Sequence, residues 1–323
     1  MLAQAASRLK DAGPQHVVIM RRCNSTSSRD MEYQHVNPIL SDSMVRTSGV
    51  EAEPLISVVV AVFNGVETLT RCIDSVSRQT YNNRELIVMD GGSVDGTRDL
   101  IERNAQHIAY WESERDRGIY HAWNKALEVA HGDWVYFLGA DDYFFDDYVL
   151  ALVTPHLKRR STYARVVYGR VDLVRKDGSV IETFGSPWNR KRFFQLMTLP
   201  HQGVFHHRSL FQEHGHFNEE FRIAGDYELL LRELKSRDPV FIVDVTIAAM
   251  QFGGMSSDQR FSIETLREIR RARELNSIKV IPIPWLWVFL KAHARRFLYR
   301  SLGNTMTRVL ANIYRRLTLR CPV

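Results

Sequence analysis

The run FLGADD, from Phe137 to Asp142, decides the fold of this chain. The residues from Trp134 to Leu138 predict a buried strand, which ends in two small residues and then in two adjacent carboxylates. Carboxylates at the carboxyl end of a parallel strand lie where open α/β sheets bind their ligands. Because the two negative charges repel each other, they need a divalent cation, a sugar hydroxyl or a basic group as a partner. A polar loop that caps a helix is the alternative interpretation.

The composition is that of an ordinary globular protein, with 323 residues, of which 45% are hydrophobic and 25% are charged. Such a chain is long enough for one large domain or two small ones. Its cysteines, Cys23, Cys72 and Cys321, lie far apart and have no metal-ligand spacing. This distribution argues against a disulfide scaffold or a zinc site, and it fits a reducing compartment.

The positive charge is concentrated at the end of the chain. The formal net charge is +6, and residues 280–323 contain eight Lys or Arg and no Asp or Glu. The rest of the chain is therefore slightly acidic, which predicts no nucleic-acid partner. Apolar residues from Met306 to Leu317 share one helical face and arginines lie opposite, so we expect a basic amphipathic helix that docks on anionic lipid. Packing on the chain's own domain or on a partner is the alternative. No segment has the roughly 18 apolar residues of a membrane span.

Strand and helix patterns alternate from Pro54 onward and predict an α/β fold, with a mainly parallel sheet and helices on both faces. The expected strands are 55–63, 85–89, 108–111, 134–138, 166–174, 179–184 and 240–248, and the expected helices are 66–78, 97–103, 118–130, 225–234 and 262–276. Residues 1–53 are polar and without periodicity, so we expect them to be disordered. The resulting domains are 1–53, 54–255 and a helical, basic extension at 256–323.

The loop DGGSVDGT, Asp90 to Thr97, closes one expected strand and opens a helix. Its glycines allow a tight turn and a close approach to a ligand. Asp90 either accepts hydrogen bonds from a base or ribose or stabilises the turn, whereas Asp95 is better explained as a helix cap. The loop matches neither a Walker motif nor GxGxxG, which argues against a dinucleotide site.

Three further segments carry candidate site residues. Asp116 and His121 lie on a charged loop before a helix, where they could reach a sugar or ribose, unless the loop is only solvated. Asp226 opens the helix GDYELLLR either as a general base or as an N-cap. His201 and Gln202 follow Pro200 and could line an acceptor pocket. The histidines between 201 and 216 lack the spacing of a zinc site.

Taken in this order, the motifs resemble those of family 2 glycosyltransferases with the GT-A fold, over residues 54–257. The resemblance implies a nucleotide-sugar donor and a Mg²⁺ or Mn²⁺ cofactor. It assigns donor binding to the first strand and the loops that follow, the metal to Asp142 and the catalytic base to Asp226. The donor-binding residues that follow from motif and resemblance are Ala61, Phe63, Asp90, Asp116 and Asp141. His121 stands where similar sequences have an acid, and the QxxRW motif of processive synthases is absent.

The resemblance implies an inverting, non-processive transfer of a single sugar to a hydroxyl of a glycan or lipid-linked acceptor, in cell-envelope polysaccharide or glycolipid biosynthesis. The enzyme would be cytoplasmic and peripheral on the inner face of the plasma membrane. Two alternatives remain. The first is a nucleotide-sugar-binding protein without catalysis, and the second is a sugar nucleotidyltransferase. The second would need a Gly-rich basic loop after the first strand, where this chain has Phe63-Asn64-Gly65.

Overall fold

The computed structural model describes residues 52–160, 164–253 and 262–278, together with 286, 289 and 290. Contacts divide the chain into residues 1–49 and 50–323, and all the described residues belong to the second unit. The expected disorder before residue 52 and the basic amphipathic helix near the end of the chain lie outside the described residues. Within the described part, no helix is long and apolar enough to cross a membrane.

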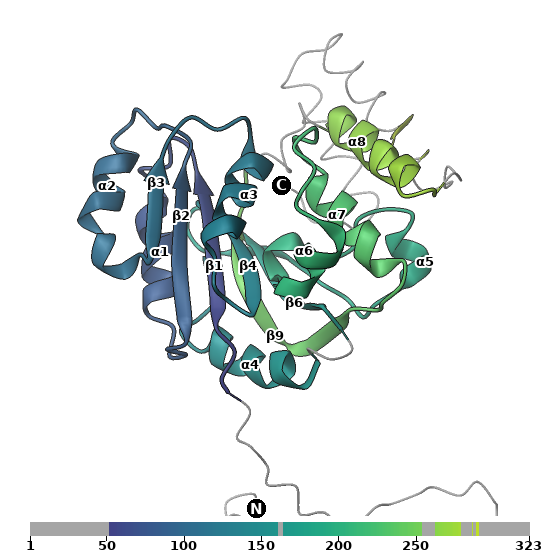
Figure 1. Ribbon diagram of the computed structural model, residues 1–323, viewed down its shortest axis with the longest axis horizontal. Helices are drawn as coiled ribbons and strands as arrows, with labels where there is room; N and C mark the ends of the chain where they lie inside the picture. The colour runs from purple at the N-terminus through teal and green to yellow at the C-terminus, as the bar shows by residue number, and fades with distance from the viewer. Residues whose placement is uncertain (1–51, 161–163, 254–261, 279–285, 287–288, 291–323) are drawn as a thin grey trace, which may run out of the picture. The chain divides into compact units, whose positions relative to one another are not determined.

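One half of the sheet is parallel, as the alternating pattern predicted (Figure 1). It comprises β1 (Ile56–Val62), β2 (Arg84–Asp90), β3 (Tyr110–Ser113) and β4 (Trp134–Gly139), in the order β3-β2-β1-β4. The helices α1 (Leu69–Ser77), α2 (Thr97–Arg103) and α3 (Ile119–Val129) make the crossovers. The strand expected at 108–111 instead runs from Tyr110 to Ser113, because Ile108 still belongs to the turn after the short 3₁₀ helix Ala105–His107.

The other half of the sheet is mixed. β8 (Val204–His207) runs antiparallel between β4 and β6 (Val166–Val174). β6 then pairs in parallel with β9 (Val240–Gln251), which carries β5 (Tyr143–Phe144) at its far edge. The predicted hairpin between β6 and β7 (Val180–Phe184) is confirmed, and its turn contains Gly178 at a φ of +83°. The mainly parallel character therefore holds for the first half only.

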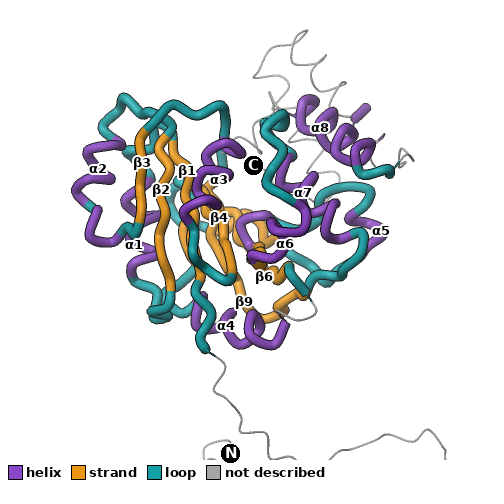
Figure 2. Tube along the Cα trace, in the orientation of Figure 1, coloured by secondary structure: helices purple, strands orange, loops and turns teal. Residues whose placement is uncertain are grey.

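Helices cover both faces of the sheet, with the strands (orange) between helices (purple) in Figure 2. Val58 and Val60 of β1 pack into a core with residues of α1, α2 and α4 (Val149–Arg160). Val59 faces the other core, with residues of α3, α6 (Arg208–His214), α7 (Gly225–Leu234) and α8 (Ser262–Leu275). A short helix, α5 (Arg190–Phe193), joins this second layer through the buried Phe193. Burial of both faces explains the continuous valine run in β1.

The sequence pattern missed three α-helices and two strands, namely α4, α5, α6, β5 and β8. For α4 and β8 the reason can be identified. α4 contains Pro155, a residue that normally breaks a helix interior. β8 has only four residues, VFHH, and its two histidines hide the apolar signal. The buried side chain of His206 nevertheless belongs to the core, where its ring contacts Phe137.

Candidate active site

The carboxyl ends of the parallel strands meet at one edge of the sheet. In the strand register, Ala61 lies between Met89 of β2 and Gly139 of β4. One residue further, Val62 pairs with Asp90, which in turn pairs with Ser113 of β3. The segments that follow these strands, including Phe63 and the acidic pair, therefore start from the same edge. This is where ligands bind in open α/β sheets.

Asp90 is fully buried, and its carboxylate is held by serines of two loops. It accepts hydrogen bonds from the backbone N–H of Ser93 (3.1 Å), from the Ser93 hydroxyl and from the Ser113 hydroxyl (2.6 Å). These contacts favour the structural interpretation of Asp90, as the residue that fixes the loop after β2. The same loop is tied to β1, because the Asn64 N–H donates to Ser93 Oγ at 2.7 Å.

Asp95 hydrogen-bonds to the start of α2, although the N-cap residue is Gly96 and not Asp95 as expected. Its carboxylate accepts from the Thr97 N–H at 3.0 Å and from the Val66 N–H at 3.2 Å. Gly96 lies between Asp95 and the helix and adopts a φ of +95°, which a residue with a side chain would rarely take. Asp95 therefore joins the loops after β1 and β2.

Phe63 and Asp116 border the same glycine at this edge. A Cβ atom on Gly91 would lie 3.4 Å from the Phe63 ring and 3.4 Å from Asp116 Oδ2. The Phe63 side chain is 66% exposed and offers an aromatic face for stacking. Asp116 is paired with two basic side chains, His121 Nδ1 at 3.0 Å and Lys125 Nζ at 2.9 Å. The Lys125 ammonium thus balances the charge of Asp116, to which the His121 ring also hydrogen-bonds.

The acidic pair sits over Gly139. A Cβ atom on this glycine would lie 2.4 Å from Asp142 Oδ2 and 3.1 Å from Asp141 Oδ1, so no larger residue fits while both carboxylates keep these positions. Asp142 is only 2% exposed. Its burial, and then the negative charge of Asp141, raise the pKa of Asp142 to about 7. Ionisation of both acids is therefore unfavourable unless a positive charge lies beside them.

Polar groups from distant parts of the chain hold this pair. The Gln251 N–H donates to Asp142 Oδ1 at 2.9 Å, and the Gln202 side chain hydrogen-bonds to the same carboxylate. Arg71 of α1 donates to the Asp141 carbonyl oxygen (3.2 Å) and to Gln251 Oε1 (2.9 Å). The Arg71 guanidinium also stacks on the Tyr143 ring, 4.2 Å from its centroid. Sequence reasoning missed Arg71 and Gln251, because neither belongs to a motif.

Asp226 lies in the first turn of α7 but is not its N-cap. The N-cap residue is Ala224, and no side chain caps the helix there. Asp226 Oδ1 instead accepts from the Tyr227 N–H at 2.8 Å and lies 3.4 Å from the Tyr120 hydroxyl. Dense protein surroundings raise the pKa of Asp226 to about 6. The N-cap interpretation is therefore wrong, and a carboxylate with this pKa suits proton transfer near neutral pH.

Tyr120 connects Asp226 to the sheet edge. It belongs to the first turn of α3, which follows the loop that leaves β3, and it is buried. The Gly225 N–H donates to the Tyr120 hydroxyl at 2.8 Å. A Cβ on Gly225 would lie 2.7 Å from the Tyr120 ring, so this close packing requires glycine. The sequence patterns did not predict this role of Tyr120.

His201 and Gln202, both expected at an acceptor pocket, have different surroundings. His201 is buried in an aromatic stack, with its ring centroid 5.1 Å from that of Trp123, and burial lowers its pKa to about 3. Its ring is therefore neutral. Gln202 extends instead to Asp142, and its carbonyl oxygen accepts from the Tyr136 hydroxyl at 2.5 Å. Gln202 thus belongs with the acidic pair.

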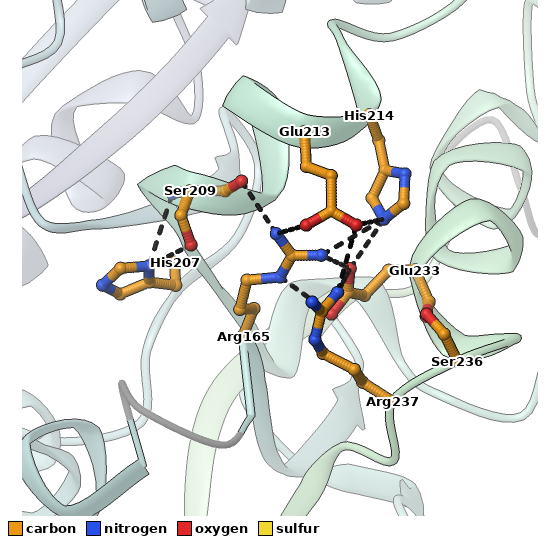
Figure 3. A network of polar contacts seen from close by, with 8 residues as sticks. All are labelled: Arg165, His207, Ser209, Glu213, His214, Glu233, Ser236 and Arg237. Atoms are coloured by element: carbon orange, nitrogen blue, oxygen red, sulfur yellow. Dashed lines mark hydrogen bonds and ion pairs between the residues drawn. The ribbon is translucent and has the colours of Figure 1, made fainter.

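A buried ionic network fixes the far part of α7 (Figure 3). Arg165, 7% exposed, donates to Glu233 Oε1 at 3.0 Å and to Glu213 Oε2 at 2.8 Å. His214 Nε2 lies 2.8 Å from Glu233 Oε2, and Arg237 lies 3.7 Å from the same oxygen. The network joins the residue before β6 to α6 and α7. His214, from the histidine-rich window, thus has a structural role.

The fold and this arrangement of acids define a sugar-transferring class of enzyme. The family model described as "Glycosyl transferase family 2" matches residues 57–214. The chain is 33% identical over 195 residues to an uncharacterized glycosyltransferase of Mycobacterium tuberculosis, covering 58% of this chain and 72% of the relative. The chain therefore belongs to glycosyltransferase family 2 and is a glycosyltransferase.

Other relatives extend this comparison. A PGL/p-HBAD biosynthesis glycosyltransferase of Mycobacterium tuberculosis is 29% identical over 213 residues, which are 64% of this chain and 80% of the relative. Among solved structures, the mannosyltransferase PcManGT of Pyrobaculum calidifontis, in complex with GDP-Man and Mn²⁺, has a TM-score of 0.56 at 18% identity, covering 84% of this chain and 82% of that one. S. aureus TarS 1-349 with UDP-GlcNAc has a TM-score of 0.53 at 17% identity, covering 74% and 72%. These structures share the GT-A fold of this chain.

Proposed function

We propose that the protein transfers one sugar from a nucleotide-diphosphate-sugar to an acceptor hydroxyl, with inversion at the anomeric carbon. Asp226 removes the proton of the hydroxyl as its oxygen attacks the anomeric carbon opposite the leaving diphosphate. The observation that carries this proposal is a carboxylate with a pKa of about 6, oriented by Tyr120 beside the sheet edge that bears the acidic pair. Direct displacement of the diphosphate by the acceptor oxygen inverts the configuration of the anomeric carbon.

The acidic pair fits a divalent cation, Mg²⁺ or Mn²⁺. Asp142 and Asp141 lie against the same glycine, and burial, followed by the charge of Asp141, raises the pKa of Asp142. Among the described residues, no group of three or more His, Cys, Asp or Glu side chains forms a metal cage. Two carboxylates with donor phosphates as further ligands suit Mg²⁺ or Mn²⁺ better than an all-protein site. Once bound, the cation would neutralise the charge of the leaving diphosphate.

The donor nucleotide would bind at the same edge of the sheet. The exposed Phe63 ring suits stacking on a base, and Ala61 is the last residue but one of the strand that precedes it. Asp141, at the surface side of the pair, suits the ribose hydroxyls. Asp90 and Asp116 would act through the loops that they hold, because serines and basic side chains already engage their carboxylates. Support for a nucleotide-sugar donor comes from TarS and PcManGT, whose structures contain UDP-GlcNAc and GDP-Man.

The acceptor hydroxyl belongs to a glycan or to a lipid-linked acceptor of the cell envelope. Two observations support this proposal, the name of the mycobacterial PGL/p-HBAD relative and the basic, apolar-faced sequence after residue 280. The enzyme would work from the cytoplasmic side, docked on anionic lipid at the inner face of the plasma membrane. Sedimentation with phosphatidylglycerol vesicles, but not with phosphatidylcholine vesicles, should require residues 281–323. Equal sedimentation of a chain ending at residue 280 would contradict this.

A screen of UDP-glucose, UDP-GlcNAc and GDP-mannose, each with and without Mn²⁺, tests the function. We expect at least one of them to raise the melting temperature and to be hydrolysed slowly in the presence of Mn²⁺. Stabilisation without hydrolysis or transfer would favour the non-catalytic binding protein. Formation of a nucleotide-sugar from a nucleoside triphosphate and a sugar 1-phosphate would favour the nucleotidyltransferase.

A further inference from the structure

The backbone just before α7 is held by a side chain from α8. Three successive N–H groups donate to the Glu268 carboxylate: Arg222 to Oε1 at 3.0 Å, Ile223 to Oε2 at 2.9 Å and Ala224 to Oε2 at 2.8 Å. Ala224 is the N-cap residue of α7, and Asp226 follows two positions later. Glu268 therefore holds the backbone segment that determines where α7 begins and so where Asp226 lies.

Ala224 and the first residues of α7 form a helix end where N–H donors lack partners within the helix, and Arg222 and Ile223 come just before it. A side chain near the N-cap usually satisfies them, and a first-turn aspartate is well placed for that. Here Glu268 accepts from the donors up to Ala224, and Tyr120 accepts from the Gly225 N–H. Asp226 accepts from the Tyr227 N–H, so the donors that precede it depend on Glu268 and Tyr120 and not on the candidate base.

We propose that Glu268 is a positioning residue for Asp226. Through Glu268, α8 becomes part of the active site of the proposed glycosyl transfer. The inference rests on the proposed function, since it assigns a purpose to the placement of the base. The charge of Glu268 also affects Asp226. The negative Glu268 carboxylate contributes to the raised pKa of Asp226, after the larger effect of burial.

α8 is fixed firmly enough to hold Glu268 in place. Leu266, Ile269 and Ala272 are buried in the core that also contains α7. Further along, the Asn276 side chain donates to Glu228 Oε1 of α7 at 3.3 Å, in buried surroundings. The two helices are therefore joined on both sides of Glu268. Neither the family model, which ends at residue 214, nor any sequence motif includes this residue.

Glu268→Gln tests the proposal with Glu264→Gln as its matched control. Glutamine keeps the length of the side chain but replaces one acceptor oxygen with a donor group. Glu264 lies one turn earlier on the same helix and is exposed. In Glu268→Gln we expect hydrogen exchange at the amides of 222–224 to be about tenfold faster or more, because charged hydrogen bonds are lost. We expect no such change in Glu264→Gln.

Kinetics then separate positioning from mere stability. The probe is whichever of UDP-glucose, UDP-GlcNAc or GDP-mannose the unmodified protein hydrolyses with Mn²⁺. Glu268→Gln should lower kcat about tenfold or more, with the donor KM changed by less than about twofold. Its kcat should also begin to fall at a lower pH, because the pKa of Asp226 drops.

Unchanged exchange at 222–224, or a kcat equal to that of the Glu264→Gln control, would overturn the proposal. The exchange measurement needs no turnover and stays informative if the proposed function fails. Full activity of Asp226→Asn would refute the base itself. Full activity of Glu268→Gln beside an inactive Asp226→Asn would refute only the role of Glu268.

Discussion

The Tyr120 hydroxyl touches the Asp226 segment at two points. It accepts a hydrogen bond from the Gly225 N–H at 2.8 Å and lies 3.4 Å from Asp226 Oδ1. One buried phenol thus fixes both the backbone and the carboxylate of the candidate base. Its hydroxyl stabilises the ionised form of Asp226, against the burial that raises the pKa to about 6.

The pH dependence of the reaction should follow from this pair. Asp226 has to be deprotonated to act as a base, so kcat should rise as the pH passes upward through about 6. Tyr120→Phe removes a donor to the ionised carboxylate, so the pKa of Asp226 should rise and the acidic limb should move to higher pH. At neutral pH we expect a loss of kcat of about tenfold. A pH profile of kcat measures this.

Tyr81→Phe is a suitable control for that experiment, because the Tyr81 hydroxyl donates to the Pro54 carbonyl, which lies before β1. Its pH profile should match that of the unmodified protein. An identical acidic limb in Tyr120→Phe would contradict the predicted link between the two side chains.

Asp226→Asn should abolish transfer and leave donor binding largely intact. The amide has nearly the same shape but cannot take a proton, and the loss of a general base costs about 10²- to 10⁴-fold in kcat. Calorimetric titration with UDP or GDP in Mn²⁺ should give an affinity like that of the unmodified protein. Asp238→Asn, a change at an exposed side chain, is the control. Near-normal turnover of Asp226→Asn would show that the base has been assigned wrongly.

Asp142→Ala should lose the metal-dependent part of donor binding. Only the Asp141 carboxylate remains to bind a cation, and the repulsion between the two acids is lost. We expect Mn²⁺ no longer to increase the affinity for UDP or GDP, as measured by calorimetry. Asp147→Asn, in an exposed pair with Arg78, serves as the control. A Mn²⁺ effect that survives in Asp142→Ala would exclude this aspartate as a ligand.

Glu233→Gln should destabilise the protein without touching the site. The Glu233 side chain is fully buried and faces Arg165, so its loss leaves a buried positive charge poorly compensated. We expect the free energy of unfolding to fall by about 3 kcal/mol. Glu213→Gln, whose side chain is 49% exposed, should cost less than about 1 kcal/mol. Urea unfolding compares the two variants, and equal losses would contradict the importance of burial.

The sequence predicted those parts of the molecule whose signal is local. The valine run of β1 and the acids directly after β4 are contiguous, so the strand and its edge could be inferred together. Arg71, Gln251 and Glu268 could not be predicted, because each acts across a contact between elements far apart in the chain. Sequence alone also left Asp226 open between cap and base. The choice depends on where α7 begins, and helix ends are the least certain feature of a sequence pattern.

The placement of Glu268 bears on how such enzymes could be recombined. The family-matched segment, 57–214, contains the acidic pair, whereas Asp226 and its anchor on α8 both lie beyond it. A chimera that receives 57–214 from a relative would import the acidic pair and the loops proposed to bind the donor. It would keep the recipient's proposed base and its Gln251, which holds Asp142. Tyr120 is the imported residue that must fit Gly225 and Asp226 of the recipient. Under the proposed assignments, most of the donor site and the base come from different segments of the chain, which are in contact through the Tyr120 hydroxyl.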